Sequence, residues 1–187
     1  IFFADLPLIL WPMHIVFMEL IIDPACSIIF EAEKEEANVM SRPPASMHEP
    51  FFGGRKIFFS CMQGVGVLAV VLAIYGIGLR LEYSENEVRT FAFIALISAN
   101  IAVILSNRSW TRNIFQILIV PNATVKWVVG GAILFLAVVL NVPFLLQVFL
   151  FTPVDPLEIA LCAGAGLLSI TGFEVYKGIY RKGIRFV

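Results

Sequence analysis

The stretch Glu19-Leu-Ile-Ile-Asp23-Pro24 decides the fold, because it sets two acids and a proline inside an apolar run from Leu8 to Phe30. A run of this length is long enough to cross the hydrocarbon core of a bilayer. Glu19 and Asp23 are four residues apart, which places them one above the other on one face of a helix. Pro24 removes a backbone donor and clashes with the carbonyl four residues earlier, so we expect the helix to kink or open there. Freed carbonyls beside paired carboxylates favour a cation site at membrane depth. The alternative is a proline kink whose acids face a water-filled gap.

The composition places the whole chain in a membrane. Of 187 residues, 59% are hydrophobic and 14% are charged, and the mean hydropathy is +0.90. Soluble domains are about half apolar and about a quarter charged, so this is an integral membrane protein. Basic patches interleaved with aromatic residues are absent from the sequence, which argues against a nucleic-acid partner. The three cysteines lie far apart in apolar runs, and their spacing predicts no disulfide framework. Cys26 could be a soft metal ligand, but a small buried residue is the favoured interpretation.

The alternation of apolar and polar segments predicts an all-α membrane protein, a bundle of five transmembrane helices forming one domain over 1–187. An acidic, proline-rich loop separates the first two helices, and the apolar core of 114–120 is expected to lie along the membrane interface. The five predicted spans cover about 8–30, 57–79, 90–106, 127–151 and 157–176.

Small residues inside these spans predict close helix packing. The second span carries Gly64, Gly66, Gly76 and Gly78, and the fifth is rich in alanine and glycine over 160–166. Small side chains let neighbouring membrane helices approach closely, so we interpret the glycines of the second span as packing positions.

Polar residues within or beside the spans are further candidates. Asn100 needs a partner at mid-depth, either another helix or an ion, and we favour a hydrogen bond between helices. His14 could bind a metal or titrate, although a solvated histidine at the membrane border is the favoured interpretation. Glu174 is expected to pair with Lys177 rather than to bind an ion.

The distribution of basic residues predicts the orientation. Lysine and arginine gather in the acidic loop, in the connection over 107–126 and in the tail, whereas the opposite side carries only Arg80 and Arg89. The positive-inside rule therefore puts these three segments, and the C-terminus, in the cytoplasm. Asn107 and Asn122 match the glycosylation pattern, but on the cytoplasmic side we expect neither to be used. The chain then starts outside without a signal peptide, which leads us to expect a preceding span in a longer protein.

The chemistry of the paired acids favours cation–proton exchange. Two carboxylates about 6 Å apart in a low-dielectric setting cannot both stay ionised without a cation or a proton. Calcium takes about six to eight oxygen ligands, and Glu19 and Asp23 supply at most about four. The remaining ligands must come from water, from opened backbone or from helices outside this chain.

The order of these features resembles a known family. An apolar helix with acids, an acidic loop, the motif Met40-Ser-Arg42-Pro43-Pro44 and four further spans are similar to the C-terminal membrane region of P-type cation-transporting ATPases of the calcium-pump type. The resemblance covers nearly the whole chain, as membrane helices six to ten with the end of five. The Arg-Pro-Pro loop is its most specific part. It implies either a contact of that loop with the phosphorylation domain or a rigid connector.

The family's pattern in helix six is Asn-x-x-Thr-Asp, and this chain departs from it. Glu19 stands at the asparagine position, Ile22 at the threonine position and Asp23 at the aspartate position. The resemblance therefore implies that Asp23 is a cation ligand and that Glu19 is a substitute with more charge. The family's glutamate in helix eight has no counterpart, since 95–100 contains no acid. One divalent ion, calcium or manganese, is easier to support than two calcium ions.

The resemblance implies the ion-pathway part of an ATP-driven pump in the plasma membrane. Its expected partners are the transported cation, protons as counter-ion, the lipid bilayer, and the N-terminal helices and cytoplasmic domains of the same pump. The phosphorylated motif Asp-Lys-Thr-Gly is missing from this sequence, as is the Cys-Pro-Cys site of heavy-metal pumps. We therefore expect no cofactor and no catalytic site in this chain, and ATP and Mg²⁺ for the full-length enzyme. The alternative is a free-standing helical membrane protein, either a passive cation channel or an interaction scaffold.

Overall fold

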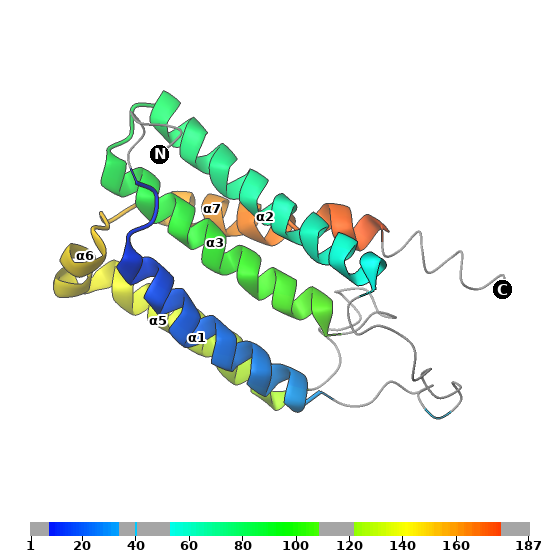
Figure 1. The fold of residues 1–187 in the computed structure, drawn as a ribbon. Coiled ribbons are helices and arrows are strands. Elements are labelled where there is room, and N and C mark those ends of the chain that lie inside the picture. Colours follow the sequence, from blue (N-terminus) through cyan, green and yellow to red (C-terminus); the bar gives the residue numbers. More distant parts are fainter. Residues whose placement is uncertain (1–7, 34–39, 41–52, 109–121, 177–187) are drawn as a thin grey trace.

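The computed structural model describes residues 8–33, 40, 53–108 and 122–176, and this part of the chain is helical without strands. Figure 1 shows the helices side by side in a bundle. Their bounds are Pro12–Glu31 for α1, Gly54–Arg80 for α2, Glu85–Asn107 for α3, Ala123–Asn141 for α5, Pro143–Phe149 for α6 and Pro156–Leu168 for α7. A further helical segment covers 171–176 after a turn.

Helix α3 is the centre of the bundle. It runs between α2 and α7 on one side and α1 and α5 on the other (Figure 1). Every residue of α3 over 88–95 is buried, and Phe93 and Ile94 are fully enclosed. Because α3 is covered on both sides, most of its surface is removed from lipid, whereas the other helices keep large exposed apolar faces. Polar groups on α3 therefore depend on partners within the bundle.

Local sequence explains where α3 begins. Leu81 to Ser84 connect α2 to α3, and Glu82 adopts a left-handed backbone with φ 59°. The Ser84 N–H donates to the Glu87 carboxylate at 2.8 Å, and the Glu87 N–H donates to the Ser84 hydroxyl at 3.4 Å. This reciprocal capping box satisfies backbone donors that a helix start leaves without partners.

Glycines bring α3 into contact with its neighbours. A Cβ on Gly166 of α7 would lie 2.3 Å from the Ala95 carbonyl oxygen, and one on Gly78 of α2 would lie 2.8 Å from a methyl of Val88. The predicted packing role is thus confirmed at Gly78, and also at Gly66, where a Cβ would lie 2.9 Å from the Ser169 carbonyl oxygen. At Gly64 and Gly76 a Cβ would meet nothing within 4 Å, so the same prediction is wrong there. Gly64 borders the open groove between α2 and α3 rather than a tight helix contact.

The predicted single span over 127–151 is wrong. The structure divides it into α5 and α6, which meet at Val142. Val142 is extended, with φ −91° and ψ 116°, because the residue before a proline is pushed out of the helical region. Pro143 then opens α6, where its missing N–H and fixed φ fit the first helical position.

Four helices of the described segments are long and apolar enough to cross a membrane: Ile57–Arg80, Glu85–Asn107, Ala123–Asn141 and Pro156–Tyr176. The first predicted span corresponds to α1, which is not among these four, so the count of five stays a prediction.

The helix ends alternate between the two ends of the bundle (Figure 1). The ends next to the acidic loop, the 107–126 connection and the tail lie together, as the predicted orientation requires. The Arg42-Pro43-Pro44 loop, the interfacial segment 114–120 and Lys177 lie outside the described residues.

Candidate functional site

Helix α1 carries the predicted site, and it is continuous. Pro12 occupies its first turn, and Pro24 lies inside the helix without interrupting it. The expected opening at Pro24 is therefore wrong. A proline removes one main-chain hydrogen bond, and the bonds of the flanking turns can carry the helix through it. The carbonyl that loses its donor belongs to Leu20, four residues earlier, so the backbone can offer at most this one freed oxygen.

Glu19 lies on an uncovered face of α1. Its side chain is exposed, and so are the neighbouring Ile15, Val16 and Leu20, at 50%, 65% and 72% of their surfaces. Asp23 follows one helical turn later, and its side chain is outside the described part of the structure. A carboxylate on an apolar membrane helix is costly unless polar groups or a cation approach it. The exposed face of α1 is thus open to a partner that the described helices do not supply.

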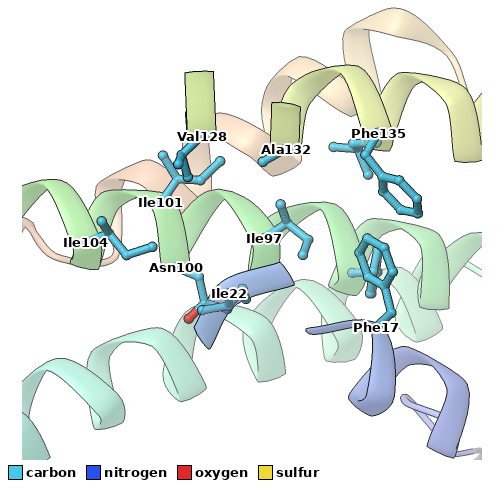
Figure 2. A pocket seen from close by; sticks show the side chains of 11 residues that line it. Phe17, Ile22, Ile97, Asn100, Ile101, Ile104, Val128, Ala132 and Phe135 are labelled. Atoms are coloured by element: carbon cyan, nitrogen blue, oxygen red, sulfur yellow. The ribbon is translucent and has the colours of Figure 1, made fainter. Parts of the chain in front are cut away.

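The opposite face of α1 packs into the bundle. Phe17 and Ile22 line a small cavity of about 30 Å³ between α1, α3 and α5. In Figure 2, Val128, Ala132 and Phe135 of α5 face these two residues across the cavity. The cavity is large enough for a water molecule, but Asn100 is its only polar lining residue among those described. The predicted cation site does not lie here, because Glu19 is not part of the lining.

Asn100 has no hydrogen-bond partner within the described chain, so the predicted bond between helices is not found there and stays a prediction. Its side chain lines two spaces, and Figure 2 shows it at the first of them. One is the small cavity beside Ile22, and the other is an open groove of about 660 Å³ between α2 and α3. A bond across α2 and α3 forms instead at Asn107. Gln63 Nε2 donates to Asn107 Oδ1 at 3.0 Å, and Asn107 Nδ2 donates back to Gln63 Oε1 at 3.2 Å.

His14 is fully buried, which contradicts the predicted solvated histidine. Its ring packs against Phe93, Phe149 and Phe151, with centroids 5.4, 5.7 and 5.1 Å away. The Trp11 N–H donates to His14 Nδ1 at 2.9 Å, so Nε2 must carry the proton in the bond of 2.9 Å to the Phe149 carbonyl. Both ring nitrogens therefore have partners, and His14 joins the start of α1 to the end of α6.

Arg89 holds the same end of the bundle together, a role that the sequence did not reveal. Its guanidinium is buried and donates to the carbonyls of Leu150 at 3.3 Å and Leu8 at 3.2 Å. Leu150 ends α6 in a left-handed backbone, with φ 51°. Carbonyls at a helix C-terminus carry partial negative charge, so a buried arginine there is compensated without a carboxylate. The sequence placed Arg89 in the charged connection before the third predicted span, and nothing in it indicated a buried position.

A second polar cluster joins three helices at the other end. Arg108, the C-cap residue of α3, donates from Nε to Glu33 Oε2 at 2.7 Å and from Nη2 to Glu33 Oε1 at 3.1 Å. Asn122 Nδ2 donates to the same carboxylate at 3.0 Å, and Asn122 Oδ1 caps α5 by accepting from the Thr124 N–H at 3.0 Å. We call Glu33, Arg108 and Asn122 the Arg108 cluster. From the sequence, Glu33 and Arg108 were predicted to lie in loops, and no pattern indicated that they form a contact.

Glu174 is bound within the bundle. The Ser106 hydroxyl donates to its carboxylate, which links α3 to the helical segment over 171–176. The predicted partner, Lys177, is outside the described residues, so that pairing stays untested. No set of three or more His, Cys, Asp or Glu side chains within the described ranges is arranged to hold a metal ion.

Comparison with known proteins supplies the family. A family model described as "Cation transporting ATPase, C-terminus" matches residues 7–179. No curated relative matches the chain. The match covers the acid-bearing helix, the loops and all the described helices.

Proposed function

Because the chain belongs to the family of cation-transporting ATPase C-termini, we propose that its α1 forms part of the cation pathway of an ATP-driven pump. In this proposal Glu19 and Asp23 are ligands of the translocated cation. The family places the chain in the membrane part of such a pump, and the apolar helices fit a multi-pass position in the bilayer. Calcium or manganese are the proposed cargo, since carboxylate oxygens suit both ions.

The exposed carboxylate of Glu19 carries the proposal. It stands among exposed apolar side chains on the face of α1 that α3 and α5 leave uncovered. A charge facing hydrocarbon alone would be strongly unfavourable, which supports a polar partner at this face. Helices of the same pump outside this chain would cover it and add ligands.

The continuous α1 limits what this chain contributes to the site. Two carboxylates and the Leu20 carbonyl offer at most about five oxygens, against about six to eight for calcium. Water or other helices must therefore complete the coordination shell. Protons would neutralise the two acids after the ion leaves, so we propose proton counter-transport. ATP and Mg²⁺ would act in the cytoplasmic domains of the full-length pump.

Ion-dependent phosphorylation of the full-length protein by ATP tests the proposal. Glu19→Gln and Asp23→Asn are expected to raise the half-saturating concentration of Ca²⁺ or Mn²⁺ by about tenfold or more, since each removes a charged ligand. Glu31→Gln is the matched control, because Glu31 is an exposed acid at the end of the same helix. Unchanged ion dependence in both site variants would remove Glu19 and Asp23 from the pathway.

A further inference from the structure

We propose that Arg108 is a positioning residue for cation binding, acting through Glu33 to hold α1 in register with α3. The inference rests on the proposed function of Glu19 and Asp23, and it concerns residues that do not touch the ion. Helix α1 is attached by polar contacts near its two ends, and one of its faces is uncovered between them.

The contacts within the Arg108 cluster define one relative orientation of its three side chains. The guanidinium is buried, with 2% of its side chain exposed, and both of its contacts to Glu33 use separate oxygens. A two-point contact between planar groups defines orientation as well as distance. Asn122 adds a third contact to the same carboxylate, and it is held by its own capping bond to α5. The end of α1 is thus tied to both α3 and α5.

The other end of α1 is fixed independently. His14 is enclosed by three phenylalanine rings and bonded through both ring nitrogens, one within α1 and one to α6. Ile29, close to the Arg108 cluster, is also fully buried and packs with Ile104, Leu105 and Val125. The helix is therefore anchored near both of its ends by contacts of different chemistry.

Between the anchors, one face of α1 packs into the bundle through Phe17 and Ile22, and the other face is uncovered. Glu19 and Leu20 are exposed, and Pro24 removes one hydrogen bond from this part of the helix. Asp23 lies about 12 Å along the helix axis from Glu31, the last residue of α1, and Glu33 follows two residues later. Because a helix transmits rotation and sliding along its length, the contact at Glu33 sets where the two acids point. Releasing that contact would leave this end of α1 held only by apolar contacts such as those of Ile29, which fix rotation and sliding less tightly than a two-point polar contact.

Loss of the pair should therefore change affinity rather than only stability. Arg108→Gln and Glu33→Gln in the full-length pump are expected to raise the half-saturating cation concentration for phosphorylation on the order of tenfold. Phosphorylation at saturating cation should stay near the wild-type level, because a high ion concentration still occupies a site whose ligands are misplaced. Arg108→Lys keeps the charge without the two-point contact, and a smaller shift is expected. The exchanged double variant Glu33→Arg with Arg108→Glu should restore much of the affinity.

The matched control is Gln63→Leu. It removes a polar contact between α2 and α3 at the same end of the bundle without touching α1, so the half-saturating concentration should not change. Equal shifts in Gln63→Leu and Arg108→Gln would overturn the positioning role, as would Arg108 and Glu33 variants that lower only the melting temperature.

If instead Glu19→Gln and Asp23→Asn leave ion dependence unchanged, the proposed function itself fails, which is a separate result. Should the exchanged variant not fold, the comparison of Arg108→Lys with Arg108→Gln still decides between the two roles.

Discussion

At the scale of single residues, the most consequential side chains are polar groups that the bundle encloses. His14 and Arg89 satisfy the carbonyls that end α6, and Arg108 meets Glu33 at the opposite end. An enclosed polar group without a partner costs about 1–3 kcal/mol, so each of these contacts weighs heavily on stability. None of the three was assigned its partner from sequence, because pairing depends on residues far away in the chain.

Replacement of His14 by phenylalanine tests the first of these contacts. The variant keeps an aromatic ring among Phe93, Phe149 and Phe151 but leaves the Trp11 N–H and the Phe149 carbonyl without their partner. We expect the free energy of unfolding to fall by about 1–3 kcal/mol. Thermal unfolding in detergent measures the change, and Trp127→Phe, at a side chain that is 82% exposed, is the control. An unaltered melting temperature in His14→Phe would contradict the bonding described here.

Tyr83 provides a prediction for alkaline pH. Its hydroxyl donates to the Glu158 carboxylate at 2.9 Å, and this bond, with the nearby negative charge, raises the pKa of Tyr83 above its ordinary value. A raised pKa means that the contact stabilises the fold below the ordinary tyrosine pKa of about 10. That contribution is lost as pH rises through the elevated pKa. An ultraviolet titration of tyrosinate should show a late-titrating component that is reduced in Tyr83→Phe and shifted to lower pH in Glu158→Gln. Identical titration curves for wild type and Glu158→Gln would refute the contact.

At the scale of helices, close approach between α3 and α7 depends on one missing side chain. A Cβ at Gly166 would meet the Ala95 carbonyl, which is backbone and cannot move aside cheaply. We expect Gly166→Ala to lower the free energy of unfolding by about 1–3 kcal/mol. Gly164→Ala, two residues earlier in the same helix, meets nothing within 4 Å and should be neutral or slightly stabilising. Thermal melting of the two variants measures the difference, and equal melting temperatures for both would contradict the close approach of α3 and α7.

Two prolines show how far element boundaries can be read from sequence. Pro143 ends one helix and starts another, whereas Pro24 lies inside a continuous α1. The rules for proline apply to both, since each removes a donor and crowds the preceding turn. Val142 adopts an extended backbone before Pro143, whereas the turns on both sides of Pro24 stay helical. The difference is decided by surrounding packing, which a single sequence does not contain.

At the scale of the whole molecule, apolar length and composition were enough to predict the helical membrane class and most spans. The candidate acids were also visible, because charge in an apolar run stands out. The Arg108 cluster and the burial of His14 were not visible, since they join residues such as Glu33 and Arg108 from distant helix ends. The orientation of the bundle rests on the distribution of basic residues and stays a prediction.

Labelling from the two sides of the membrane tests that orientation. Glu82 is exposed in the α2–α3 connection, and Met40, in the acidic loop, is 95% exposed. In a variant without the three native cysteines, Glu82→Cys should react with a membrane-impermeant thiol reagent applied to intact cells. Met40→Cys should react only after permeabilisation. The reverse pattern would invert the topology and move the acidic loop outside.

The most direct test of the central claim is equilibrium binding of Ca²⁺ and Mn²⁺ to the purified full-length pump, with released protons followed in weak buffer. We expect wild type and Glu31→Gln to bind the ion and release protons, whereas Glu19→Gln and Asp23→Asn should lose most of both signals. Wild-type binding and proton release retained in both site variants would contradict it.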